Sequence, residues 1–376
     1  MEEWIKCPLG DILNFRRGHD LPKTSMVPGD IPVAGSNGII GFHNVSTPIS
    51  PCITIGRSGN VGTPYIYDIC WAHNTVLYID DYKGNDPKYL YYLLKTLPLA
   101  SFGGGSAVPT LNRNHIHPME VIFCKDTELQ KKIAGILSKI DDKIELNRQI
   151  NDNLEQQAQA LYKSWFVDFE PFKDGEFIES ELGQIPEGWQ CIPFSMFVSE
   201  SKAKTGKIGI KEYSVTNNGI FPRDAKYNKS LSQSSTKNKL ILYGDLVFGM
   251  SRDILNWGVM QEEQGGVSSA YTVYNINSGI VNSTYLELFI KSRIHLFSDL
   301  IRPAAREGQG IDKSVLQTKV LLCPPQEVLD TFWPLYNSVT NQIQRTTTEI
   351  NCLGDVRDTL LPKLMSGELE INEIDC

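Results

Sequence analysis

The sequence predicts an α+β fold that is a tandem duplication: two mixed α/β domains, each followed by a long helix. Two observations carry this prediction. Short segments recur in the same order in both halves of the chain, and each half ends in a heptad pattern about 40 residues long. The chain has 376 residues, which is enough for two ordinary domains and too long for one compact core.

Four short segments recur, at an offset that drifts between about 180 and 200 residues, as expected when surface loops differ in length. The matched pairs are Trp4–Leu9 with Trp189–Phe194, Val33–Ile39 with Val215–Ile220, Ile53–Ser58 with Val247–Arg252, and Val121–Cys124 with Val320–Cys323. Each match alone is weak, but four in the same order indicate a duplication. The third match predicts that Arg57 and Arg252 occupy equivalent positions.

The expected order of domains follows from the repeat. It is a first mixed domain at residues 1–126, a long helix at 127–170, a linker with a second mixed domain at 171–325, a second long helix at 326–366 and a tail at 367–376. Short runs rich in Val, Ile and Tyr, broken by Gly, Pro and Asn, predict strands and turns within each domain. A shorter helix is expected before each long one, at residues 87–95 and 284–297.

Both long helices carry a narrow apolar seam with alternating steps of four and three residues. The first seam is Ile133, Leu137, Ile140, Ile144, Asn147, Asn151, Leu154, Ala158, Leu161 and Trp165; the second is Phe332, Leu335, Val339, Gln342, Thr346, Ile350, Leu353, Val356 or Arg357, Leu360 and Leu364. We expect the helices to pair as an antiparallel coiled coil, with Asn147 and Asn151 facing Gln342 and Thr346 and fixing the register. The alternative is two separate helices, each folded onto its own domain.

The net charge of −8 at first argues against a nucleic-acid partner. The acidic excess, however, is concentrated in the two helices, the linker and the tail. Residues 201–260 hold ten Lys and Arg against four acidic residues, a local surplus that is compatible with phosphate contact. A solvated lysine-rich face is the alternative reading of the same pattern.

Signatures of catalysis are missing from the sequence. There is no G-x-x-x-x-G-K-[ST] phosphate loop, no Asn/Asp-Pro-Pro-aromatic signature of amino-methyltransferases and no G-x-S-x-G elbow. The eight cysteines are far apart without a C-x-x-C pair, and His115 and His117 lack a third ligand at a recognisable spacing. We therefore expect no catalytic residue, no metal site and a reducing, cytoplasmic environment. No apolar run is long enough for a membrane-spanning helix.

Binding chemistry has more support than catalysis. Polar, glycine-containing loops follow or precede apolar strands at matching places in the two halves, and Arg, Gln, Asn and Ser are residue types that contact phosphates and base edges. The candidate DNA-binding residues are Arg57, Ser58, Asn60, Asn112, Arg113, Lys202, Lys204, Lys207, Ser251, Arg252, Arg302, Arg306 and Gln309. The alternative is that these loops are merely turns.

Three segments near the ends of the long helices resemble a known family. They are Thr359–Leu369 (TLLPKLMSGEL), Tyr162–Phe169 (YKSWFVDF) and Ile185–Trp189 (IPEGW). They are similar to the specificity subunit of type I restriction-modification systems, and the resemblance extends over the whole chain.

The resemblance implies two target-recognition domains, each reading one half of a split double-stranded DNA sequence. The helices would act as the spacer and as the docking surface for two methyltransferase (M) subunits, with restriction (R) subunits completing the complex. This chain would be non-catalytic and hold no cofactor. The complex would be an adenine-specific DNA methyltransferase and site-specific endonuclease for host defence, and its other chains would use S-adenosylmethionine, ATP and Mg²⁺.

Other classes of function stay open on the sequence alone. An orphan methyltransferase or nuclease is disfavoured by the missing motifs. A coiled-coil scaffold, or a tandem module that binds carbohydrate or protein without DNA specificity, is the main alternative. The salt dependence of binding discriminates these, because DNA binding weakens steeply as salt rises.

Overall fold

The computed structural model describes residues 4–103, 110–207, 209–223, 235–251, 253–301 and 310–371. The chain divides into two compact units. Unit 1 consists of residues 1–153 and 342–376, and unit 2 consists of residues 154–341. Each long helix therefore contributes one part to each unit. Within the described residues, no helix has the length and apolar character that crossing a membrane requires.

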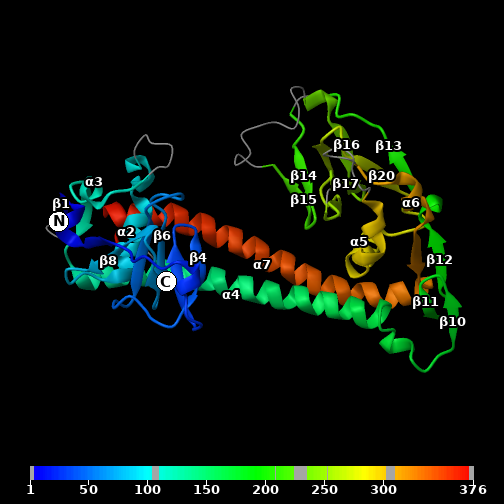
Figure 1. The fold of residues 1–376 in the computed structure, drawn as a ribbon, viewed down its shortest axis with the longest axis horizontal. Coiled ribbons are helices and arrows are strands. Elements are labelled where there is room, and N and C mark those ends of the chain that lie inside the picture. The colour runs from blue at the N-terminus through cyan, green and yellow to red at the C-terminus, as the bar shows by residue number, and fades with distance from the viewer. Residues whose placement is uncertain are drawn as a thin grey trace. The chain divides into compact units, whose positions relative to one another are not determined.

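Unit 1 is a mixed domain built mainly from antiparallel strands (Figure 1). Its strands are β1 (Trp4–Pro8), β2 (Asn14–Arg17), β3 (Ile31–Gly35), β4 (Gly38–His43), β5 (Cys52–Gly56), β6 (Pro64–Tyr67), β7 (Trp71–Ala72), β8 (Val76–Asp81) and β9 (Glu120–Cys124). Its short helices are α1 (Leu9–Ile12), α2 (Pro87–Thr96) and α3 (Arg113–Ile116), with 3-10 turns at Lys23–Ser25 and Leu99–Phe102. The expected helix at 87–95 is confirmed by α2.

The centre of unit 1 is the four-stranded sheet β2-β8-β5-β6. Every residue of β5 is buried, as a central strand with both faces covered requires. Helix α2 begins where Asp86 accepts a hydrogen bond from the backbone N–H of Tyr89 at 2.8 Å, with Pro87 in the first turn. Its apolar face, including Leu90 and Leu93, joins the same core.

Unit 2 repeats this plan. Its strands are β10 (Phe177–Ser180), β11 (Gly183–Pro186), β12 (Gln190–Pro193), β13 (Val198–Ser201), β14 (Tyr213–Thr216), β15 (Gly219–Pro222), β16 (Lys239–Leu242), β17 (Leu246–Phe248), β18 (Trp257–Val259), β19 (Gln264–Val267), β20 (Thr272–Ile276) and β21 (Val320–Cys323). Its helices are α5 (Ser283–Ser292) and α6 (Lys313–Thr318), with 3-10 turns at Glu170–Phe172, Phe194–Met196, Ser235–Lys237 and Ile294–Leu300.

The duplication is visible in the strand order. The sheet β13-β20-β17-β18 of unit 2 has the same order as β2-β8-β5-β6 of unit 1, and β12 pairs with β21 as β1 pairs with β9. The hairpins β3–β4 and β14–β15 and the helices α2 and α5 also correspond. The fold class predicted from the sequence is thereby confirmed.

Backbone hydrogen bonds show which residues correspond in the two central strands, β5 of unit 1 and β17 of unit 2. The N–H of Gly56 donates to the carbonyl of Thr63 at 3.1 Å, and the N–H of Gly249 donates to the carbonyl of Asn256 at 2.8 Å. Both bonds span seven residues and close the loop that follows the central strand. Gly56 and Gly249 are therefore equivalent.

The equivalence of Gly56 and Gly249 corrects one prediction. Counting on from the two glycines, Arg57 corresponds to Met250 and Ser58 to Ser251. The predicted pairing of Arg57 with Arg252 is therefore wrong by two residues. Matching the sequences by the shared Arg-Ser residue types misplaced the alignment, because only the ladder hydrogen bonds define which strand positions correspond.

The long helices are α4 (Thr127–Phe166) and α7 (Gln326–Ser366). At the start of α4, the Asp126 carboxylate accepts a hydrogen bond from the N–H of Glu128 at 2.8 Å, as a helix cap does. The helix ends at Phe166, before the expected end at residue 170, and Phe169 then adopts a left-handed backbone with φ 55°. Helix α7 ends at Ser366, and Gly367 has φ 72°, the usual glycine termination.

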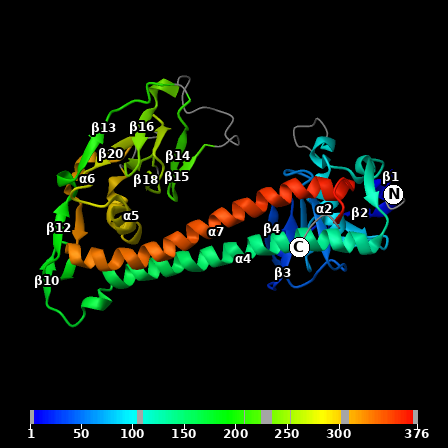
Figure 2. The same ribbon diagram turned by 180° about the vertical axis from the view of Figure 1, so that it is seen from behind.

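Helices α4 and α7 pack against each other in an antiparallel sense within each unit (Figures 1 and 2). In unit 1, Asp141 of α4 contacts Arg357 of α7, and Asn151 contacts Thr346. In unit 2, the rings of Phe166 and Phe332 lie 4.7 Å apart. The predicted seam of α4 is buried or half-buried throughout.

The predicted seam of α7 needs two corrections. Leu335 is 48% exposed and Gln342 is also exposed, whereas the neighbouring Tyr336 and Ile343 are half-buried. Gln342 is therefore not a register residue of the seam. A seam through Leu335 and Gln342 and a seam through Tyr336 and Ile343 have the same seven-residue spacing. Packing against α4 selects the second one.

Candidate nucleic-acid interface

Four arginines of unit 1 converge on one hollow, although they lie far apart in the sequence. Arg16 and Arg17 end strand β2, Arg57 follows strand β5, and Arg113 begins helix α3. All four line a hollow of about 370 Å³, together with Leu77, Thr110, Leu111 and Asn112. We call this the arginine hollow. Pairing of both β2 and β5 with β8 brings these segments together.

Arg57 is held by its backbone on both sides. Its N–H donates to the carbonyl of Thr75 at 2.8 Å, and its carbonyl accepts from the N–H of Leu111 at 2.7 Å. The preceding residue must be glycine, because a Cβ on Gly56 would lie 1.7 Å from the carbonyl oxygen of Asn60. The tight loop thus fixes the backbone of Arg57 and leaves its side chain half-buried in the hollow.

Arg113 is placed by the start of helix α3. The side-chain oxygen of Asn112 accepts a hydrogen bond from the N–H of Asn114 at 3.0 Å, which caps this short helix. The Nη1 atom of Arg113 donates to the carbonyl of Phe15 on strand β2 at 3.1 Å. That bond uses part of the guanidinium group and leaves other donors exposed to solvent.

The arginine hollow is an uncompensated positive site. Among the described residues, none of its four arginines forms an ion pair with a carboxylate. Partial burial, and then the charge of Arg17, lower the pKa of Arg57. Like charges gathered without counterions favour a polyanionic ligand, since binding it would relieve their repulsion.

The structure brings together some of the predicted residues of the first half and separates others. Arg57, Asn112 and Arg113 line the hollow. Ser58 is adjacent, in a bridge to Thr110. The side chain of Asn60 accepts a hydrogen bond from Thr63 at 3.1 Å within its own loop, which ties it to turn structure.

Arg16 and Arg17 were missed by reasoning from the sequence. The signal that could have found them is the pair of adjacent arginines at the end of a short strand near the start of the repeat. Their relation to Arg57 was invisible without the strand pairing, because 40 residues separate Arg17 from Arg57.

In unit 2 the predicted candidates have mixed positions. Lys202, Lys204 and Lys207 are exposed. Ser251 is buried, and its hydroxyl accepts a hydrogen bond from the N–H of Asn256 at 2.9 Å, so it shapes the loop. The remaining candidates, Arg252, Arg302, Arg306 and Gln309, lie outside the described residues.

The repeat locates the counterpart of the arginine hollow in unit 2. Ser201 and Arg16 occupy equivalent positions opposite β20 and β8, so Lys202 takes the place of Arg17. Helices α6 and α3 begin at equivalent caps, Asp312 and Asn112, so Lys313 takes the place of Arg113. Basic residues are therefore retained at two corresponding positions.

Unlike the arginine hollow, this site contains a carboxylate. Lys313 Nζ lies 2.5 Å from Glu200 Oε1, and Lys239 Nζ donates to the carbonyl of Tyr271 at 2.5 Å. The hydrogen bond from Lys313 lowers the pKa of Glu200, and the charges of Lys239 and Lys202 act in the same direction. We call Glu200, Lys202, Lys239 and Lys313 the lysine–glutamate cluster.

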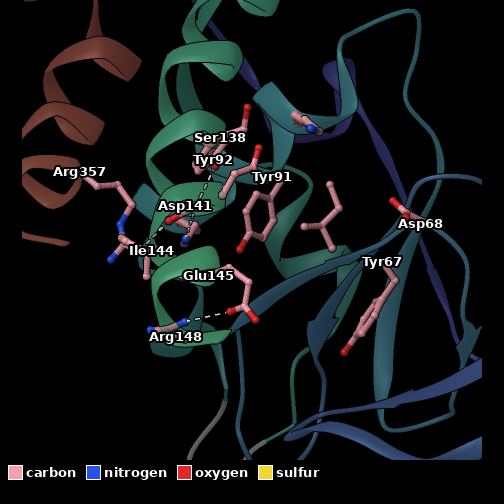
Figure 3. Close-up of a pocket in the computed structure, with 14 residues that line it drawn as sticks. Tyr67, Asp68, Tyr91, Tyr92, Ser138, Asp141, Ile144, Glu145, Arg148 and Arg357 are labelled. Atoms are coloured by element: carbon pink, nitrogen blue, oxygen red, sulfur yellow. Dashed lines mark hydrogen bonds and ion pairs between the residues drawn. The ribbon is translucent and has the colours of Figure 1, made fainter. Parts of the chain in front are cut away.

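A larger hollow of about 550 Å³ lies elsewhere in unit 1, between α2, β6 and α4 (Figure 3). Its charges are mostly paired: Arg357 Nη1 lies 2.7 Å from Asp141 Oδ1, and Arg148 Nη1 lies 3.6 Å from Glu145 Oε2. Such internal pairing makes it a poor anion site. In the described part of the chain, no group of His, Cys, Asp and Glu is arranged to hold a metal ion.

Comparison with known proteins agrees with this architecture. Residues 1–156 match the family described as type I restriction modification DNA specificity domain. The chain is 29% identical over 307 residues to the type I restriction enzyme MjaIX specificity subunit of Methanocaldococcus jannaschii, covering 76% of this chain and 70% of that protein. It is 65% identical over 48 residues to the HindI specificity subunit of Haemophilus influenzae, covering 13% of this chain and 10% of that protein.

A solved structure shares the fold over nearly the full length. The type I restriction-modification S subunit from M. genitalium aligns with a TM-score of 0.58 and 14% identity, covering 96% of each chain. The duplicated domains and the paired long helices are thus the fold of that S subunit. The first 156 residues match that family's DNA specificity domain, and most of the chain is similar to type I specificity subunits.

Proposed function

We propose that this chain reads a bipartite DNA target and positions methyltransferase and restriction subunits on it. The observation that carries the proposal is the arginine hollow, four guanidinium groups without carboxylate partners in the described chain, with basic residues retained at its counterpart in unit 2. Guanidinium groups match both phosphate oxygens and the guanine edge. Two similar domains that differ in these side chains would read two different half-sites.

The partners in this proposal are double-stranded DNA with a split recognition sequence, two M subunits and the R subunits. S-adenosylmethionine, ATP and Mg²⁺ would be used by those other chains, and the complex would methylate adenine. The paired helices α4 and α7 would serve as the spacer and the docking surface.

The test uses the complex of this chain with its M subunits and a DNA target found by mapping modified adenines. We expect Arg57→Ala to weaken specific binding by about 1–3 kcal/mol if the side chain contacts a base. If Arg57 contacts phosphate instead, the slope of log K against log salt should fall by about one. Lys173→Ala is the control, because Lys173 is an exposed lysine paired with Glu170 in the linker.

Either response of Arg57→Ala would support the proposal. Unchanged affinity and an unchanged salt slope, with the control also unaffected, would assign Arg57 to turn structure. Binding that is insensitive to salt in the unmodified complex would favour the alternative, a coiled-coil scaffold or a tandem ligand-binding module without DNA specificity.

A further inference from the structure

The two equivalent sites differ in the kind of hydrogen bond that their charged side chains can make. The arginine hollow presents guanidinium groups, which only donate hydrogen bonds. The lysine–glutamate cluster adds a carboxylate at the corresponding place in unit 2. An ionised carboxylate only accepts, so among the charged side chains the site in unit 2 adds an acceptor to its lysine donors, which the arginine hollow lacks.

Glu200 is accessible to a ligand although it is paired. It lies on β13 opposite Tyr274, and its side chain is 25% exposed, while that of Lys313 is 50% exposed. The exposed Lys202 follows on the same strand segment, and Lys239 comes from the neighbouring strand β16. The carboxylate therefore sits near lysines that can hold phosphate groups.

The ion pair is not needed to tie helix α6 to strand β13. In unit 1 the equivalent residue Arg113 reaches the equivalent strand position through the backbone carbonyl of Phe15, at 3.1 Å. A partly exposed Lys–Glu pair contributes only about 0–1 kcal/mol to stability. A carboxylate at residue 200 is therefore not required to hold helix α6 against strand β13, because a backbone carbonyl serves this purpose in unit 1.

The edges of the bases decide which of them such a carboxylate can read. In the major groove, cytosine presents its N4 amino group as a donor, without an acceptor in its own edge. Adenine presents N6 as a donor beside the acceptor N7, which would repel a carboxylate and suits an amide instead. Guanine and thymine present acceptors in the major groove, and these repel a carboxylate.

We propose that Glu200 is a specificity-determining residue of the second recognition domain, which accepts a hydrogen bond from the N4 amino group of a cytosine in the second half-site. The proposal rests on the proposed function, because it requires that unit 2 contacts DNA. In the free protein Lys313 occupies one carboxylate oxygen, and the second oxygen remains for the base.

The experiment compares variants in the complex with the M subunits, by sequencing the modified sites that each complex produces. Glu200→Gln should change one position of the second half-site from cytosine toward adenine, because an amide donates to N7 and accepts from N6. The preference for cytosine at that position should fall about tenfold or more. The first half-site should stay unchanged.

Two further variants separate base reading from the ion pair itself. Lys313→Ala removes the same ion pair but keeps the carboxylate, so it should weaken binding and retain the preference for cytosine. Glu262→Gln is the matched control, because Glu262 forms a similar exposed pair with Lys211 at 3.0 Å in the same unit. It should leave the modified sequence unchanged. Thermal unfolding of each variant shows that the domain is folded.

The outcomes are distinct. An unchanged second half-site in Glu200→Gln, the same change in Lys313→Ala, or a natural second half-site without a C·G pair would overturn the role of Glu200. If the unmodified complex showed no sequence-specific modification at all, the proposed function itself would fail.

Discussion

Two asparagines of the α4–α7 helix pair, Asn147 and Asn151, differ in their hydrogen bonding. The Asn151 side chain accepts from the hydroxyl of Thr346 and donates to Thr347 Oγ1 at 3.0 Å. Asn147 is only 1% exposed, yet neither amide atom has a hydrogen-bond partner in the described part of the chain. A buried amide of this kind lowers stability and can still restrict register, since alternative pairings would bury it among other apolar groups.

Replacing Asn147 should therefore stabilise the protein. We expect Asn147→Leu to raise the free energy of unfolding by about 1–3 kcal/mol, because the unpaired amide is removed from an apolar seam. Asn151→Leu should lower it, since the hydrogen bonds of Asn151 to Thr346 and Thr347 across the helix pair are lost, and both hydroxyl groups then bond only to carbonyl groups of their own helix. Urea denaturation of both variants measures the difference. A loss of stability in Asn147→Leu would show that its amide makes hydrogen bonds that matter.

At the scale of elements, a carboxylate joins three helices of unit 1. Asp141 on α4 accepts a hydrogen bond from the Tyr92 hydroxyl of α2 at 2.8 Å and pairs with Arg357 of α7 at 2.7 Å. Lys95 Nζ of α2 lies 3.8 Å from Asp141 Oδ2. In unit 2 the two long helices are joined instead by aromatic rings, among them Phe166 and Phe332.

Removal of the Asp141 carboxylate should loosen this junction. Asp141→Ala is expected to lower the free energy of unfolding by about 1–3 kcal/mol, because it leaves the buried Tyr92 hydroxyl without its acceptor and the half-buried Arg357 with only the exposed Asp358. Asp142→Ala is the matched control, an exposed neighbour whose loss should change stability by no more than about 0.5 kcal/mol. Equal effects of the two variants in chemical denaturation would show that the junction is not stabilising.

At the scale of the whole molecule, the proposed function makes the helix pair a spacer between half-sites. Half-sites on one duplex must be separated by a near-fixed number of base pairs, because each added pair rotates the second site about the helix axis. Inserting one heptad after Asn153 of α4 and another after Asn341 of α7 keeps both seams in phase. Each insertion lengthens its helix by about 10 Å.

The expected result is a gap longer by about three base pairs, since DNA rises about 3.4 Å per pair. Both half-sites should stay as they were, because neither recognition domain is altered. Sequencing of modified sites measures the gap, and co-purification with the M subunits confirms assembly. If the assembled variant kept the original gap, contacts with the M subunits would position the domains instead of the helix length.

Much of this architecture could be predicted from residues that are near one another in the chain. The seam from Ile133 to Trp165 is visible because a helix repeats its environment every three to four residues. The duplication is visible because matched segments such as Val121–Cys124 and Val320–Cys323 kept their apolar pattern. Missing catalytic motifs also required no structure to recognise.

The tertiary structure alone decided how distant segments meet. Arg17 and Arg57 share a hollow because β2 and β5 both pair with β8, and no local pattern encodes that pairing. The same is true of Glu200 and Lys313, which 113 residues separate. The mistaken pairing of Arg57 with Arg252 and the misplaced Gln342 have one physical cause. Periodicity limits a residue to a face, whereas hydrogen-bond register and side-chain packing choose the position.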